Sequence, residues 1–150
     1  MISVLLVDDH VMVRAGLERL LDQTNGIEIA AIADDGTAAV DLDGELEPDV
    51  ILMDLSMPGM DGIEATRRIC ERRPEARVVM LTAHSEKTRV LAALDAGASG
   101  YLVKDAAPEA LIDGVRAAAE GNAPLDSRAA RAVLDARHER GQAKLTTRES

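Results

Sequence analysis

Aromatic side chains are nearly absent from this chain. Its 150 residues include no phenylalanine and no tryptophan, and the one tyrosine is Tyr101. An electron carrier that binds flavin needs aromatic rings to stack on the flavin and a phosphate-cradling loop after its first strand. The chain has two carboxylates at that point, Asp8 and Asp9, so both features argue against a flavodoxin-like electron carrier.

Cysteine and long apolar runs are also scarce. The single cysteine, Cys70, cannot form an intramolecular disulfide, and its helical spacing from Ile63 and Thr66 predicts a half-buried helix position. One unpaired cysteine fits a reducing cytosol. No apolar run approaches the roughly 20 residues of a membrane span, and the N-terminus lacks the basic start and cleavage site of a signal peptide. We therefore expect a soluble cytoplasmic protein with no membrane partner.

Positive charge is in deficit. Lysine and arginine number 17 against 27 aspartate and glutamate residues, which gives a net charge of −10. The negative excess lies in residues 1–125, whereas residues 126–150 have a small positive excess. The acidic part would repel nucleic acid, and the C-terminal segment is too weakly basic to bind DNA alone.

The length predicts one compact domain, with room for an appendage. Short apolar runs flanked by turn residues alternate with segments whose apolar residues recur at helical spacing. The runs lie at residues 2–7, 27–33, 50–53, 77–81 and 100–103. Several lack alternating polar residues, which is typical of strands covered on both faces. The pattern predicts an α/β fold, a doubly wound five-stranded parallel sheet with five helices and right-handed crossovers.

Other acidic and glycine positions have structural interpretations. The pair Asp34-Asp35 follows the second run and is interpreted as a helix cap and turn, and Asp61 is interpreted in the same way. The helix after the second run is the weakest of the predicted helices because Gly44 interrupts it, although Pro48 supplies a stop.

Polar residues directly follow four of the five apolar runs. Asp8 and Asp9 follow the first run and Asp54 the third, while Thr82 and Lys104 follow the fourth and fifth. In such sheets the ligand crevice lies beyond the carboxyl ends of the strands, where the strand order reverses. If the first and third strands are neighbours, the three carboxylates share one crevice.

Three carboxylates in one crevice repel one another and need a positively charged group beside them. Two carboxylates about 4 Å apart repel by about 4 kcal/mol at an effective dielectric constant of about 20. A bound cation removes this cost, and hard oxygen ligands with room for water suit Mg²⁺. A carboxylate beside such a metal and a lysine can attack phosphorus to form an aspartyl-phosphate. Lys104 would then neutralise the phosphoryl oxygens and the Thr82 hydroxyl would donate to one of them.

Four motifs carry a resemblance to a known family. LLVDDH, VILMDLSMPGMDG, VVMLTAH and GASGYLVKD, in this order and spacing, resemble the receiver domain of two-component response regulators, and more narrowly its NarL/FixJ-type branch. The resemblance covers about residues 1–122. It implies a flavodoxin-like sheet of strand order 2-1-3-4-5. It also implies a signal receiver phosphorylated by a sensor histidine kinase, rather than a classical enzyme.

The resemblance implies a role for each matching residue at the site. Asp54 is the expected phosphoacceptor. Mg²⁺, or Mn²⁺ in its place, is expected to bind Asp54, Asp9 directly, Asp8 through water, and the backbone carbonyl of Ser56. Lys104 is the expected ion-pair partner of the phosphate.

Thr82 and Tyr101 are the switch residues that the resemblance implies. Phosphorylation is expected to change the conformation and to favour a homodimer that controls transcription. A simpler alternative is that Tyr101 is a half-buried residue of an edge strand. In one respect the chain departs from the common family pattern, because Asp105 and not proline follows Lys104. A cis bond before a residue other than proline costs about 2.5–4 kcal/mol, so we expect a trans bond here.

The C-terminal segment is expected to be an appendage. Residues 123–144 have apolar positions at helical spacing and predict a linker helix, which could pack on its own domain or mediate dimerisation. The final hexapeptide LTTRES, residues 145–150, resembles the opening of a LuxR-type helix-turn-helix domain. Six residues cannot form such a domain, so we expect the DNA-binding part to be otherwise absent and this chain not to bind DNA specifically.

Two rival functions are compatible with parts of this pattern, and the first shares the aspartyl-phosphate chemistry. A metal-dependent phosphatase for small molecules commonly has a second carboxylate two residues after the nucleophile, but Ser56 stands there. A degenerate receiver that works without phosphorylation would lack part of the residue set, and here the set is intact.

Overall fold

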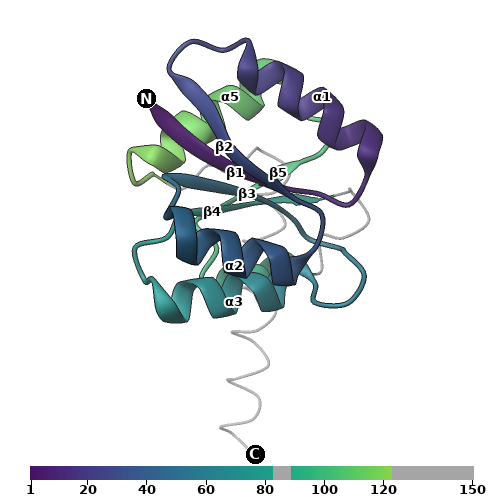
Figure 1. Ribbon diagram of the computed structural model, residues 1–150, viewed down its shortest axis with the longest axis vertical. Helices are drawn as coiled ribbons and strands as arrows, with labels where there is room; N and C mark the ends of the chain where they lie inside the picture. The colour runs from purple at the N-terminus through teal and green to yellow at the C-terminus, as the bar shows by residue number, and fades with distance from the viewer. Residues whose placement is uncertain (83–88, 123–150) are drawn as a thin grey trace, which may run out of the picture.

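The computed structural model describes residues 1–82 and 89–122 (Figure 1). The predicted linker helix over residues 123–144 and the hexapeptide at 145–150 lie outside these residues and stay predictions. Strands and helices alternate along the described chain: β1 Ile2–Val7, α1 Val11–Asp22, β2 Ile27–Ala33, α2 Gly36–Leu46, β3 Val50–Asp54, α3 Gly62–Arg72, β4 Val78–Thr82, α4 Val90–Asp95, β5 Gly100–Val103 and α5 Pro108–Ala119. No helix in this part of the chain has both the length and the hydrophobicity that crossing a bilayer requires.

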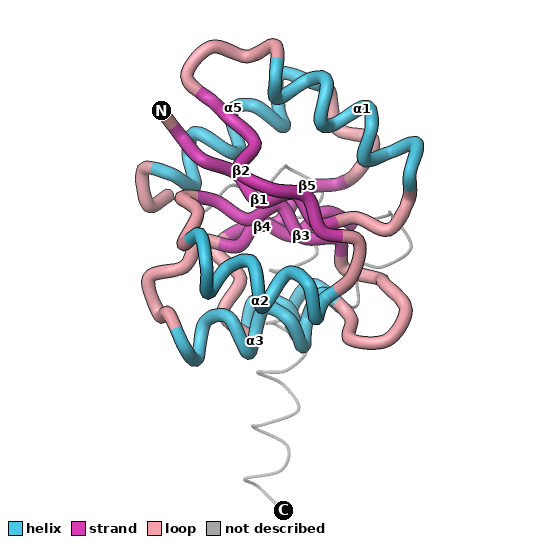
Figure 2. Tube along the Cα trace, in the orientation of Figure 1, coloured by secondary structure: helices cyan, strands magenta, loops and turns pink. Residues whose placement is uncertain are grey.

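The five strands form one parallel sheet in the order β2-β1-β3-β4-β5. This order and the alternation of elements confirm the predicted flavodoxin-like, doubly wound fold. Helices α1 and α5 cover one face of the sheet, and α2 and α3 cover the other (Figures 1 and 2). The strand order reverses between β1 and β3, which are hydrogen-bonded neighbours with Val7 opposite Met53.

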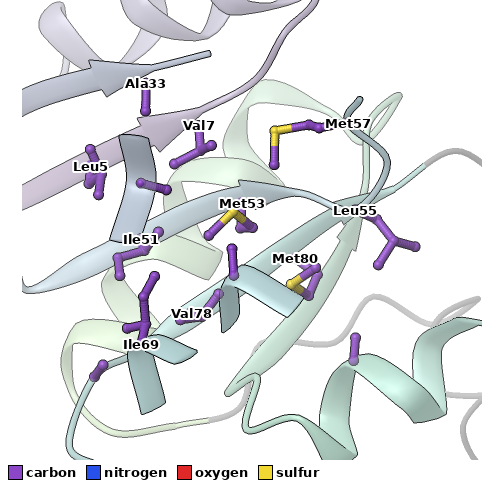
Figure 3. Packing of buried hydrophobic residues seen from close by; sticks show 14 of the residues in the cluster. Leu5, Val7, Ala33, Ile51, Met53, Leu55, Met57, Ile69, Val78 and Met80 are labelled. Carbon is purple, nitrogen blue, oxygen red and sulfur yellow. The ribbon is translucent and has the colours of Figure 1, made fainter. Parts of the chain in front are cut away.

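Both faces of the sheet are apolar because successive side chains of a strand point to opposite sides. In β1, Leu5 and Val7 enter the core that α2 and α3 cover, while Val4 and Leu6 enter the core beneath α1 and α5. Methionine fills space in the first of these cores, as Figure 3 shows for Met53, Met57 and Met80. A flexible side chain can fill irregular gaps, which suits a core with almost no aromatic rings.

The helix boundaries follow from local capping. The Asp35 carboxylate accepts a hydrogen bond from the Ala38 N–H at 2.7 Å, and the Asp61 carboxylate accepts one from the Glu64 N–H at 2.9 Å. Both aspartates are therefore N-caps, as their sequence context predicts. Helix α2 ends before Glu47, which adopts a left-handed φ of 45°.

Gly44 does not break α2, although the sequence marks it as the weak point of that helix. The guanidinium of Arg72, on α3, crosses over this glycine, and a Cβ at residue 44 would lie 3.0 Å from an Arg72 nitrogen. Arg72 also donates a hydrogen bond to the backbone carbonyl of Val40. A tertiary contact thus uses the space that the missing side chain leaves.

Helix α3 begins directly against the end of β3. The Gly62 N–H donates to the Leu55 carbonyl at 3.1 Å, and a Cβ at residue 62 would lie 2.1 Å from the backbone oxygen of Asp54. Only a residue without a side chain permits this approach. The first turn of α3 therefore fixes the backbone that positions Asp54.

Gly62→Ala should destabilise the protein by about 1–3 kcal/mol, because the added methyl group forces the backbone of α3 away from β3. Urea unfolding measures the change. Gly16→Ala is the matched control: it lies in α1 with open space around the added methyl group, so it should stabilise the fold by roughly 0.5–1 kcal/mol. Equal stability of the Gly62→Ala and native proteins would contradict the close approach.

Candidate functional site

The carboxyl ends of the strands meet where the sequence places its polar residues. Asp8 directly follows β1, Asp54 ends β3 and Lys104 directly follows β5. Asp8, Asp9, His10 and Asp54 each offer a ligand atom, and these atoms all lie within 4.8 Å of one another. The structure thus brings the three predicted carboxylates together, and it adds a histidine.

Lys104 is the ammonium group at this cluster. Its Nζ lies 3.1 Å from Asp54 Oδ1 and 3.8 Å from Asp8 Oδ2. The Ser56 N–H donates to Asp54 Oδ1 at 3.3 Å. The Lys104 N–H donates to the Thr82 carbonyl at 2.7 Å, which ties the lysine to the end of β4. The Lys104 ammonium group thus lies beside two of the three carboxylates of the cluster.

Burial makes this excess of negative charge costly. Asp8 and Asp54 are both fully buried. Within the described residues, three buried carboxylate oxygens accept no hydrogen bond: Asp8 Oδ2, Asp9 Oδ1 and Asp54 Oδ2. On burial each of these oxygens loses its hydrogen bonds to water and gains no hydrogen bond from the protein, which costs about 1–3 kcal/mol or more. Hard, unsatisfied oxygens from three side chains are the donor set that fits a divalent cation such as Mg²⁺.

The pKa of Asp54 reflects both its burial and the excess of negative charge around it. Burial is the main cause that raises the pKa of Asp54 from 3.8 to about 6. The hydrogen bond from Lys104 opposes this rise, and the charge of Asp8 adds to it. The carboxyl is therefore harder to ionise in the folded protein than in water.

His10 is a site residue that the sequence analysis missed. Its Nδ1 lies 3.1 Å from Asp9 Oδ1, 3.2 Å from Asp8 Oδ1 and 3.4 Å from Asp54 Oδ2. The available signal was its place directly after the two aspartates in LLVDDH. That position alone does not tell whether the imidazole turns into the crevice or into solvent.

Arg89 is a second site residue that the sequence analysis missed, and no local pattern in the sequence points to it. It donates to Ser56 Oγ at 2.7 Å and to Asp61 Oδ2 at 2.9 Å. The arginine precedes α4 and joins it to the loop between β3 and α3. Ser56, the predicted carbonyl ligand, is therefore held from two sides, because its N–H also donates to Asp54.

The two predicted switch residues are both buried. Thr82, 1% exposed, ends β4 one residue after Leu81, which lies opposite Asp54 in the sheet. Tyr101 is 2% exposed and packs in the core covered by α2 and α3. The alternative is right that Tyr101 lies on an edge strand, because β5 is at the edge of the sheet, but wrong that the residue is half-buried. Among the described residues there is no cis peptide bond, so the bond between Lys104 and Asp105 is trans, as expected.

The raised pKa of Asp54 predicts a pH-dependent penalty in metal-free protein. Below about pH 4 the carboxyl is protonated in both the folded and the unfolded state. Between about pH 4 and 6 the unfolded chain ionises this carboxyl and the folded protein does not, so the folded state loses stability relative to Asp54→Asn, by up to about 3 kcal/mol once the pH exceeds 6. Urea unfolding of both proteins should show a small difference at about pH 4.5 and a larger one, favouring the variant, at about pH 7.5. A difference that does not change with pH would contradict the shift.

Comparisons with known proteins agree with this geometry. Residues 4–116 match the family model of the response regulator receiver domain. The chain is 43% identical over 145 residues to the transcriptional regulatory protein LiaR of Bacillus subtilis, and it is 44% identical over 121 residues to the response regulator UvrY of Escherichia coli K12. These alignments cover 97% and 81% of this chain, and 69% and 56% of the relatives.

A solved structure is similar over nearly its whole length. The crystal structure of a LuxR-family two-component response regulator from Aurantimonas sp. SI85-9A1 superposes with a TM-score of 0.82 at 36% identity, covering 93% of this chain and 98% of that one. The family model, the relatives and the fold agree. The chain belongs to the receiver domains of two-component response regulators, and its relatives are of the LuxR/NarL type.

Proposed function

We propose that this chain is a phosphorylatable signal receiver in which Asp54 accepts one phosphoryl group from a sensor histidine kinase. The observation that carries the proposal is the ion pair at the end of β3, where the Nζ of the partly exposed Lys104 lies 3.1 Å from Oδ1 of the buried Asp54. The other oxygen of Asp54 accepts no hydrogen bond within the described residues. A lysine thus holds the carboxylate in place while an oxygen lone pair remains available for reaction.

The transfer is a displacement at phosphorus. A carboxylate oxygen of Asp54 forms the new O–P bond, the N–P bond of the phosphohistidine breaks, and the imidazole nitrogen leaves with the bonding electrons. Lys104 holds positive charge beside the phosphoryl oxygens, and the Thr82 hydroxyl donates to one of them. The site needs no general base, because the nucleophile is already a carboxylate.

The residues that would hold Mg²⁺ are Asp8, Asp9, Asp54 and the Ser56 carbonyl. When bound, the ion neutralises negative charge on the carboxylates and on the phosphoryl oxygens. Arg89 holds the Ser56 side chain, which steadies the loop that presents the carbonyl. Lys104 and the metal together would balance the three carboxylates.

Thr82 and Tyr101 are proposed to communicate phosphorylation to the rest of the chain. The Thr82 hydroxyl moves toward the phosphoryl group and changes the packing around the Tyr101 ring. Tyr101 is 2% exposed in this structure, so the ring already lies inward here, and the Thr82 contact would stabilise this inward position. A phosphoryl group shifts the two states only by its differential contacts with them, and the Thr82 contact supplies such a difference. The altered surface would favour a homodimer and so control a DNA-binding domain.

Incubation with acetyl phosphate and Mg²⁺ should add the mass of one phosphoryl group to the native chain and none to Asp54→Asn. Intact-mass spectrometry measures the gain, which should fall sharply without Mg²⁺. Asp34→Asn is the matched control, because it removes an exposed carboxylate from the similar Asp34-Asp35 pair after β2. Persistent labelling of Asp54→Asn would place the acceptor elsewhere.

A beryllofluoride mimic of the phosphoryl group should change Tyr101 fluorescence and promote dimerisation in the native chain. Thr82→Ala should lose both responses, because it removes the hydroxyl that contacts the mimic. Thr24→Ala, at a threonine whose hydroxyl bonds the Leu20 carbonyl near the end of α1, should keep both. Fluorescence and sedimentation velocity provide the readouts. Identical responses of the Thr82→Ala and native proteins would show that Thr82 is not the relay.

A further inference from the structure

His10 lies at the mouth of the carboxylate cluster, where its side chain is 58% exposed. Its Nδ1 approaches Asp9 Oδ1 at 3.1 Å and Asp54 Oδ2 at 3.4 Å. These are two of the three buried carboxylate oxygens that accept no hydrogen bond within the described residues. The imidazole nitrogen and the unsatisfied oxygens therefore converge on one point.

One hydrogen bond accounts for only part of this convergence: Nδ1 lies 3.2 Å from Asp8 Oδ1 and 3.5 Å from Lys104 Nζ, both within hydrogen-bonding distance. Nδ1 holds at most one proton, and one N–H points toward one acceptor, whereas three carboxylates lie around this atom. In an octahedral metal site with bonds of about 2.0–2.1 Å, adjacent ligand atoms lie about 3 Å apart. The separations of 3.1, 3.2 and 3.4 Å from Nδ1 are close to that edge length.

We propose that His10 is a metal ligand through Nδ1, an inference that rests on the metal site proposed above. Imidazole nitrogen suits first-row transition ions, whereas Mg²⁺ favours oxygen ligands. His10 therefore gives the site a preference for ions such as Mn²⁺ and Ni²⁺ over Mg²⁺. The exposed ring leaves access to the crevice open on the solvent side.

The direct test is pulsed electron paramagnetic resonance of Mn²⁺ added to tag-free protein. The native chain should show the nitrogen modulation of a coordinated imidazole. His10→Ala should still bind Mn²⁺ through its carboxylates but should lose this signal. The exposure of His10 makes loss of folding in this variant a small concern, and a thermal melt checks it.

Metal affinities provide the second readout. His10→Ala should lower the affinity for Ni²⁺ by about tenfold or more, and that for Mg²⁺ by less than about threefold. His138→Ala makes the same substitution outside the described residues and should change neither affinity. A residue that only positioned Asp8 or Asp9 would weaken both ions alike and would give no nitrogen signal.

The outcomes separate this inference from the function on which it rests. Bound Mn²⁺ without nitrogen modulation in the native chain, or modulation that persists in His10→Ala, overturns the role of His10 and leaves the carboxylate site intact. Failure of the native chain to bind Mn²⁺ or Mg²⁺ at all overturns the metal site itself.

Discussion

The repulsion among three carboxylates at one edge of the sheet is the constraint on which the rest of this structure depends. Asp8 and Asp54 are fully buried, and the single ammonium group that the described residues place beside them, that of Lys104, cannot neutralise them together with Asp9. Burial raises the pKa of Asp54 to about 6, which measures the cost of ionising it there. A protein selected for stability alone would not keep such a cluster. The electrostatic repulsion among the carboxylates is explained if the site binds a cation that is not part of the chain.

The fold maintains this arrangement because its two cores are apolar on both faces of the sheet. Most residues of the strands that end at the site are apolar and enter these two cores, so the cores offer few polar partners to the carboxylates. The close approach of Gly62 to the Asp54 carbonyl fixes the backbone on one side. The bond from Lys104 N–H to the Thr82 carbonyl fixes it on the other. These two contacts hold the backbone on both sides of the acidic crevice.

Much of this could be predicted from the sequence, because strand ends are local features. The apolar runs before Asp8, Asp54 and Lys104 place these residues at one edge once the sheet is parallel. The position of His10 could not be predicted, because it depends on which way one side chain rotates. The bond from Arg89 to Ser56 joins residues 33 positions apart, and no local pattern reports it. The burial of Tyr101 was missed for a similar reason, since edge position in a sheet does not reveal what the neighbouring helices cover.

The most direct test of this account counts the protons released when Mg²⁺ binds. At about pH 6, roughly half of the metal-free molecules hold a proton on Asp54, and a cation bound beside that carboxyl must displace it. Titration calorimetry in buffers of different ionisation enthalpy, with His10→Ala as the background so that only the carboxylates can release protons, should give about half a proton released per ion at about pH 6, and close to none at about pH 8 or when Asp54→Asn is added. Mg²⁺ binding without proton release at about pH 6 would contradict the claim that the cation relieves the buried charge of Asp54.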